Sequence, residues 1–245
     1  REHDLALPVF FGGRLQVEFD TEYERLVDDI YSDRLAGLMI YDIAEFWGHT
    51  PVLEADIPRV FIVSPSDNEG YHRVCFSFER FTERALEHLE KLGCKRAGVI
   101  SAMPHKPVVE HLNRRLAESP METRPYWLQY IAKGFKEEAR HLAHLLLRDL
   151  TQSTERPIGL VVNDDNIVHH VTQGIRDAGL SPEEVHVVAH CNYPCPPPTE
   201  FPVTFLGFDV ETLVEQAIRS IDRQRRGELE DGSTQLIEPE FDEER

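Results

Sequence analysis

The segment at residues 156–180, RPIGLVVNDDNIVHHVTQGIRDAGL, constrains the fold more than any other part of the chain. Its apolar run at 158–162 indicates a buried strand, which ends abruptly on the polar turn at 163–165. A helical pattern follows at once and stops at Gly179, and a second apolar run covers residues 185–189. Ligands of open α/β sheets bind where the carboxyl end of a strand meets the amino end of a helix. We therefore expect this turn to form part of the wall of a small-molecule pocket.

Strand and helix patterns alternate along almost the whole chain. Strands are expected at residues 5–11, 36–41, 59–63, 73–76, 97–101, 159–162, 185–189, 203–206 and 234–237. Helices are expected at residues 20–32, 78–92, 108–117, 134–150, after the turn at 163–165, and at 209–225. This alternation implies an α/β fold with parallel sheets joined by right-handed crossovers. A chain of 245 residues with 41% hydrophobic content can form two such lobes with a cleft between them.

Charge, hydropathy and cysteine content narrow the class of protein. The net charge of −18 opposes direct binding of nucleic acid phosphates by this chain. No apolar stretch approaches the roughly 20 residues of a membrane span, and no signal-peptide pattern is evident, so we expect no membrane partner. Two of the four cysteines lie in or beside apolar strand-like runs, which suits buried reduced thiols. We therefore expect a cytoplasmic protein.

The sequence shows no established pattern of catalytic or metal-binding residues. It contains no GxSxG elbow, P-loop, GxGxxG or HExxH. Cys191 and Cys195 lie four apart beside His190, but a zinc site needs a second pair of ligands, and none occurs at standard spacing. We predict no catalytic residue, no metal and no cofactor. The adjacent carboxylates of Asp164 and Asp165 leave a Mg²⁺-dependent enzyme as a further alternative.

Several segments together resemble the effector-binding core of the LacI/GalR family of bacterial transcription regulators. Residues 78–101, FERFTERALEHLEKLGCKRAGVIS, are similar to the family's helix ending in His-Leu, its Leu-Gly-His turn and its basic pair before an apolar strand. Cys94 stands where that turn usually carries His. The segment from residue 156 is similar to the family's Pro-x-Ala strand and Asn-Asp turn, and PVTFLGFDVETLVEQAI and STQLIEPEF resemble later elements. The likeness keeps the family's order from about Ala36 onward.

The resemblance implies a type I periplasmic-binding-protein-like fold, with two Rossmann-like lobes, three crossovers and a ligand cleft between the lobes. By analogy, the crossovers are expected near Ser101, Leu206 and Gly227. The N-terminal lobe would comprise residues 1–101 and 207–227, and the C-terminal lobe residues 102–206 and 228–245. The family's N-terminal helix-turn-helix has no counterpart in this sequence, so operator DNA would be bound through a domain outside it.

The resemblance also implies a homodimeric regulator that performs no chemistry. A small-molecule effector, namely a sugar, sugar acid or sugar phosphate, would bind one arrangement of the lobes better than the other and thereby change the affinity for operator DNA. The apolar faces of the helices at residues 20–32 and 78–92 are candidate dimer surfaces. Periplasmic solute-binding proteins of sugar transporters share the fold, and we keep that function as the alternative.

Several candidate ligand contacts of the C-terminal lobe follow from the resemblance. Asn163 and Asp164 occupy the family's strand-end Asn-Asp positions, where an amide beside a carboxylate can both donate to and accept from sugar hydroxyls. Asn and Asp are also favoured helix caps. Cys191 and Asn192 align with an Asp-Asp pair of the family, so both acids are lost. Trp127 is a candidate for stacking on a sugar, or a structural residue.

Three candidates are expected in the N-terminal lobe. Arg80 aligns with a position where many family members carry an acid facing the effector, and Arg there would favour an anionic ligand. The alternative is a solvated Arg80 paired with Glu83 on its own helix. Tyr41 and Asp42 end the strand at 36–41, where the family often has a polar effector contact. Tyr41 could stack on a ring face or pack as an aromatic residue at the edge of the core.

Overall fold

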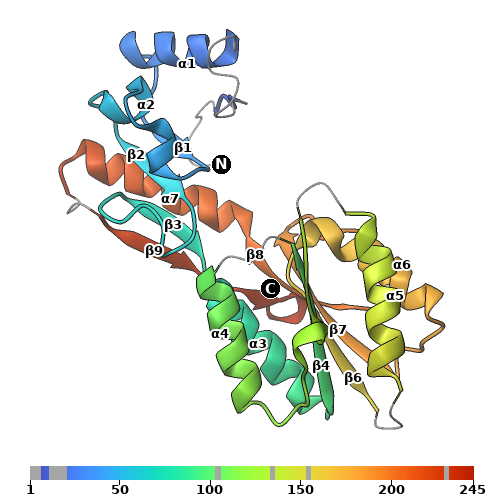
Figure 1. The fold of residues 1–245 in the computed structure, drawn as a ribbon. Coiled ribbons are helices and arrows are strands. Elements are labelled where there is room, and N and C mark those ends of the chain that lie inside the picture. The colour runs from blue at the N-terminus through green and yellow to red at the C-terminus, as the bar shows by residue number, and fades with distance from the viewer. Residues whose placement is uncertain (1–6, 11–20, 103–105, 133–135, 153–155, 229–231) are drawn as a thin grey trace. The chain divides into compact units, whose positions relative to one another are not determined.

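The computed structural model divides the chain into two compact units (Figure 1). It describes residues 7–10, 21–102, 106–132, 136–152, 156–228 and 232–245. Unit 1 consists of Arg1–Cys75 and Val214–Gln235, and unit 2 of Phe76–Leu213 and Leu236–Arg245. The chain therefore passes from one unit to the other three times, as the two-lobed expectation requires.

Unit 1 contains a four-stranded sheet with the order β1-β2-β3-β9. Its strands are β1 (Leu38–Ile40), β2 (Arg59–Ile62), β3 (Arg73–Phe76) and β9 (Thr234–Ile237). Its helices are α1 (Thr21–Tyr31), η1 (Ala44–Trp47), α2 (Pro51–Glu54) and most of α7 (Val210–Arg225). β1, β2 and β3 are parallel, and Phe61 and Val52 are buried in the unit's apolar cluster.

Unit 2 contains a six-stranded sheet with the order β10-β8-β7-β6-β4-β5. Its strands are β4 (Arg96–Ala102), β5 (Leu128–Ile131), β6 (Ile158–Val162), β7 (Val185–Tyr193), β8 (Thr204–Asp209) and the antiparallel edge strand β10 (Glu240–Phe241). Its helices are α3 (Phe78–Lys91), α4 (Lys106–Glu118), η2 (Pro125–Trp127), α5 (Glu138–Leu150), α6 (Asp165–Asp177) and η3 (Asp242–Glu244). α3 and α4 cover one face of the sheet and α5 and α6 the other (Figure 1).

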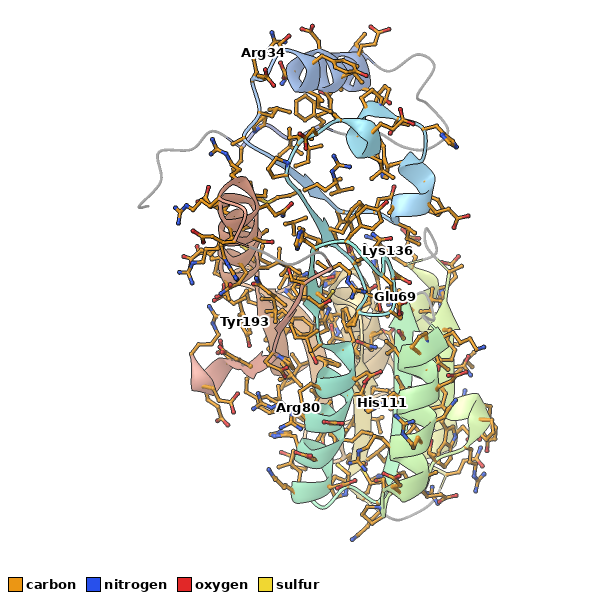
Figure 2. All side chains as sticks on the ribbon, turned by 90° about the vertical axis from the view of Figure 1, so that its left-hand side faces the viewer. Arg34, Glu69, Arg80, His111, Lys136 and Tyr193 are labelled. Carbon is orange, nitrogen blue, oxygen red and sulfur yellow. The ribbon has the colours of Figure 1, made fainter. Side chains whose placement is uncertain are left out.

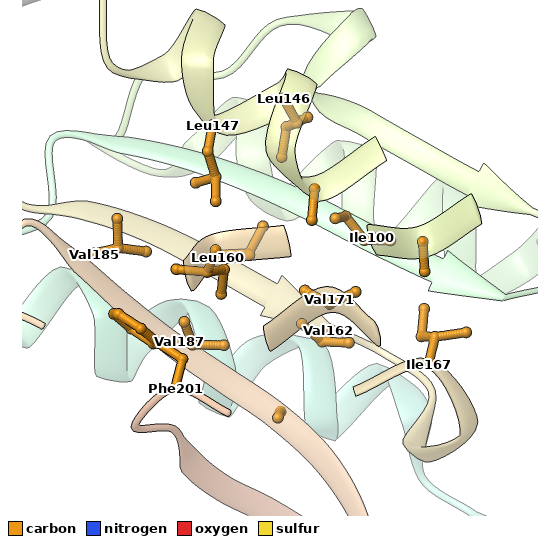
Figure 3. Close-up of a cluster of buried hydrophobic side chains, with 14 of the residues drawn as sticks. Ile100, Leu146, Leu147, Leu160, Val162, Ile167, Val171, Val185, Val187 and Phe201 are labelled. Atoms are coloured by element: carbon orange, nitrogen blue, oxygen red, sulfur yellow. The ribbon is translucent and has the colours of Figure 1, made fainter. Parts of the chain in front are cut away.

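The larger core lies between the sheet of unit 2 and the pair α5 and α6 (Figure 3). Leu160 and Val162 of β6 pack there with Leu147 of α5 and Val171 of α6. Because side chains alternate along a strand, the intervening β6 residues face α3, and a Cβ at Gly159 would contact Leu89 of that helix. The sheet is therefore covered on both faces, as its continuous apolar runs predict.

The predicted fold class is confirmed, since the structure is α/β with parallel strands in both units. The expected boundaries differ from the structure, in which the chain changes unit after Cys75, Leu213 and Gln235. The reason is that β4 is hydrogen-bonded between β5 and β6, and α3 packs on the same sheet, so residues 76–101 belong to unit 2. The expected strand at 5–11 is not confirmed, because residues 7–10 form neither strand nor helix, and residues 5, 6 and 11 lie outside the described residues. Among the helices that the structure describes, none is long and apolar enough to cross a membrane.

The crossing of α5 and α6 gives a test of the fold at Gly174. A Cβ at this position would lie 2.2 Å from the carbonyl oxygen of Arg140 and 2.9 Å from the Cβ of Ala143. We expect Gly174→Ala to destabilise the protein by about 1–3 kcal/mol, because the clash with backbone outweighs the gain in helix propensity. Chemical denaturation measures the change. Arg176→Ala on the exposed side of α6 is the control, and it should change the free energy of unfolding by less than about 0.5 kcal/mol. An unchanged stability for Gly174→Ala would contradict this helix packing.

Candidate functional site

Four polar side chains lie side by side at the carboxyl edge of the unit 2 sheet. Ser101 of β4 is in register with Tyr130 of β5. Asn163 follows the last residue of β6, which pairs with Ile100 and Ala189, so Asn163 is level with Ser101 on one side and His190 of β7 on the other. The strand neighbours of these four residues, Ile100, Ile131, Val162 and Ala189, belong to the core under α5 and α6. Because side chains alternate along a strand, the four polar side chains point to the opposite face, which α3 and α4 cover. We call this set the polar row.

Three members of the polar row carry buried atoms that lack partners. The Oδ1 of Asn163, the hydroxyl of Tyr130 and both ring nitrogens of His190 are buried, and no described residue forms a hydrogen bond with them. The Oδ1 of Asn192, two residues beyond His190 on the same face of β7, is in the same condition among the described residues. A buried polar group without a partner costs about 1–3 kcal/mol, so their concentration at one edge marks a candidate recognition site.

A second set of polar groups holds the start of α6 beside the polar row. Asp164 caps the helix, and its Oδ1 accepts from the backbone N–H of Asn166 at 2.9 Å. The Oδ2 of Asp165 accepts from the Nδ2 of Asn192 at 2.7 Å, and Lys136 donates to the Oδ1 of Asn166 at 2.9 Å. Since the Asn192 amide nitrogen donates to Asp165, its oxygen is directed away from that carboxylate. Asp165 therefore orients one of the unpartnered amide oxygens.

His190 occupies an aromatic enclosure. Its side chain belongs to a residue only 4% exposed, and its ring lies edge to face with Phe78, Phe81 and Phe208 at centroid distances of 5.5, 5.7 and 5.5 Å. Burial lowers the pKa of His190 below its ordinary value, while the carboxylates of Asp165 and Asp164 act in the opposite direction. Since burial is the larger effect, the imidazole is neutral near pH 7, with one nitrogen that donates and one that accepts.

The structure brings together three of the predicted site residues, Asn163, Asp164 and Asn192, and separates Cys191 from them. Cys191 follows the alternation of Ala189 and so lies on the other face of β7, with its sulfur beside Gly207. Burial raises the pKa of its thiol to about 11. Because neighbouring strand residues point to opposite faces, the side chain of Cys191 does not share the face of β7 that carries His190 and Asn192.

Trp127 is likewise placed away from the candidate site. It ends η2 and directly precedes β5, so it lies at the amino end of that strand, opposite the edge that carries Tyr130. The residue is 1% exposed, and its Nε1 donates to Asp149 at 2.7 Å. In this structure Trp127 packs in the core, and stacking on a ligand would require it to leave the core.

Arg80 lies on α3 in unit 2, where it forms an ion pair with Glu83 at 2.8 Å (Figure 2). Its side chain is 47% exposed, whereas its neighbour Phe81 is fully buried against the sheet. This is the solvated helix pair considered as the alternative for Arg80. Tyr41 and Asp42 belong to unit 1, where Tyr41 is 81% exposed and Asp42 accepts from the backbone N–H of Ile43 at 2.8 Å.

The sequence interpretation missed Tyr130, Ser101 and His190 as site residues. Ser101 and Tyr130 stand in the last two positions of their strands, and His190 directly follows the apolar run at 185–189, which is a signal that could have identified them. A cavity of about 340 Å³ is lined by Lys136, Glu137, Glu138 and His170, none of which belongs to the polar row. Within the described part of the chain, no three His, Cys, Asp or Glu side chains gather in a way that could hold a metal ion.

Comparisons with known proteins agree with this fold. The model of the periplasmic binding protein-like domain family matches residues 86–243. A complex of the transcriptional regulator CelR with cellobiose is 18% identical, with a TM-score of 0.68 over 90% of this chain and 68% of that chain. The Lac repressor bound to ONPG is 16% identical, with a TM-score of 0.68 over 94% and 68%. A LacI family transcription regulator from Clostridium acetobutylicum is 16% identical, with a TM-score of 0.64 over 84% and 77%. No curated protein sequence matches the chain.

The depressed pKa of His190 predicts a pH-dependent stability. The unfolded chain takes up a proton near pH 6.5 and the folded protein only at lower pH, so stability is lost as the pH falls from above 6.5 toward the folded pKa. We expect His190→Leu to reduce this loss, measured as the change in Tm between pH 7.5 and 5.5. Part of the loss should remain, because burial also lowers the pKa of His88. The exposed His141→Leu is the control, and an equal effect of both variants would refute the role of burial at His190.

Proposed function

The chain belongs to the periplasmic binding protein-like domain family, and from this we propose that it is the effector-binding domain of a LacI-type transcription regulator. The effector is a sugar or a sugar derivative that binds at the carboxyl edge of the unit 2 sheet. The fold shared with three repressors and regulators supports the regulator class. The structure of CelR is a complex with the sugar cellobiose, which supports the ligand class.

The observation that carries the proposal is the pair of buried amide oxygens of Asn163 and Asn192, for which the described residues provide no hydrogen-bond donor. An amide oxygen can only accept, so each needs a donor from a ligand. Sugar hydroxyls are donors, and they also accept, which suits the mixed groups of Tyr130 and His190 in the same row. The ligand contacts proposed here are therefore Asn163, Asn192, Tyr130 and His190, with Asp164 and Asp165 positioning the start of α6.

Ligand binding at these atoms requires a conformational change of the protein. The orphaned atoms are covered in the present arrangement, so a ligand reaches them only after the groups that cover them have moved. An effector that binds the changed arrangement better shifts the population toward it, and by reciprocity operator binding changes the affinity for the effector. Because the net charge of −18 opposes contact with phosphates, we assign DNA binding to another domain of a homodimeric regulator. No described feature favours the solute-binding alternative or an enzyme.

Replacement of Asn163 tests the proposed site. Asn163→Leu removes a buried amide oxygen that has no partner among the described residues. We therefore expect the unliganded protein to gain about 1 kcal/mol in stability and to lose at least tenfold in ligand affinity. The measurement is a thermal shift screen with cellobiose, D-glucose, D-galactose and D-ribose, because a ligand at 100 times its Kd adds about 2.7 kcal/mol to apparent stability.

The exposed Asn113 of α4 provides the matched control, since Asn113→Leu makes the same chemical change away from the polar row. This variant should keep the wild-type response to the ligand. The proposal fails if no compound of the panel raises the Tm of the wild-type protein, or if Asn163→Leu responds as strongly as Asn113→Leu.

A further inference from the structure

We infer that His190 is a specificity-determining residue, which makes the site select neutral, hydroxyl-bearing ligands over the corresponding sugar acids and sugar phosphates. This inference rests on the proposed function, because it concerns the same polar row. It sets aside the anionic ligand class that the alignment of Arg80 favoured. Two features of the structure carry it, namely the enclosure of the imidazole and the balance of donors and acceptors around it.

The enclosure keeps His190 neutral. Three phenylalanine rings from α3 and β8 surround the imidazole, and none of them can stabilise a charge by donating or accepting a conventional hydrogen bond. The charged groups that face it across the edge are Asp165 and Asp164, and they accept hydrogen bonds from the side chains of Asn192 and Asn166. In the described structure neither carboxylate contacts the ring nitrogens, so no ion pair holds an imidazolium in place.

The unpartnered atoms of the site mostly need donors. The amide oxygens of Asn163 and Asn192 only accept, and the neutral imidazole of His190 offers one donor and one acceptor. A ligand hydroxyl can serve every one of these atoms because it both donates and accepts. A carboxylate or phosphate group only accepts, so it matches the N–H of His190 and the hydroxyl of Tyr130 and leaves the amide oxygens unpaired. An ammonium group only donates, so a ligand that carries no other polar group leaves the N–H of His190 unpaired.

The charged residues at the carboxyl edge of the unit 2 sheet also favour a neutral ligand over an anionic one. Asp164 and Asp165 stand at the start of α6 beside the polar row, and their negative charges oppose an anionic group there. Arg80, the residue that could have bound such a group, is paired with Glu83 and lies near the further acids Glu87 and Glu238. Lys136 is also engaged, since it donates to Asn166. A neutral ligand avoids the repulsion and keeps these pairs intact.

The test compares neutral sugars with their own acidic derivatives by calorimetric titration at pH 7.5. The pairs are cellobiose with cellobionate, D-glucose with D-gluconate and D-glucose 6-phosphate, D-galactose with D-galacturonate, and D-ribose with D-ribose 5-phosphate. For the sugar that binds the wild-type protein, we expect at least tenfold tighter binding than for its acidic partner. An acid or phosphate that binds as tightly as its neutral partner, or more tightly, overturns the inference.

Two substitutions separate recognition by His190 from a structural role. His190→Leu should weaken binding of the neutral sugar at least tenfold, while His190→Gln, which again supplies a donor and an acceptor, should recover part of that affinity. Circular dichroism establishes that each variant is folded. If a variant does not fold, the wild-type comparison of neutral and acidic ligands still decides the question.

Comparison with Asn163→Leu shows which proposal fails. If Asn163→Leu loses binding and folded His190→Leu keeps wild-type affinity and selectivity, the effector site stands and the role of His190 is refuted. If neither the neutral nor the acidic compounds bind the wild-type protein, the proposed function fails together with this inference.

Discussion

The pairing of β6 with β4 on one side and β7 on the other is the interaction on which the site depends. Every residue of β6 is buried, and helices cover both faces of the strand. The backbone N–H of Asn163 extends this ladder by donating to the carbonyl of Ile100 at 3.0 Å. This register sets Asn163 level with Ser101 and His190, and a slip of one residue would turn Asn163 toward the α5 and α6 core. The polar row is thus a consequence of how an apolar strand is paired.

The sequence was sufficient for the fold class but not for the boundary between the units. Buried parallel strands are continuous apolar runs bounded by polar turns, and residues 97–101 and 158–162 have this form. Such a run looks the same whichever sheet it joins, because burial on both faces removes any alternation that would distinguish them. Only the pairing of β4 with β5 and β6 places residues 97–101 in unit 2. The preceding helix α3, which carries Arg80, belongs to the same unit. The crossover inferred by analogy at Ser101 was misplaced for this reason.

The structure places predicted site residues together where the prediction rested on strand ends, and apart where it rested on side-chain direction. Asn163 and Asp164 follow an evident strand end. For β7 the expected end was residue 189, whereas the strand continues to Tyr193, so the alternation that separates Cys191 from His190 and Asn192 was not available. Arg80 illustrates the same limit on a helix, since its neighbour Phe81 is buried while Arg80 pairs with Glu83 in solvent.

One face of the unit 2 sheet contributes to stability and the other to the proposed ligand recognition. The alternation of side chains along each strand separates the two sets of residues. Ile158, Leu160 and Val162 face an apolar core that contributes stability. The alternate residues face α3, and the last of them is Asn163, whose amide oxygen has no partner among the described residues. Buried polar groups without partners destabilise the unliganded protein, so recognition at this edge opposes stability. Because the two sets of residues never share a face, the polar row can change its donors and acceptors without disturbing the core. Asn192, at a position that aligns with an acid of the LacI/GalR family, would then alter which ligand is bound and leave the fold as it is.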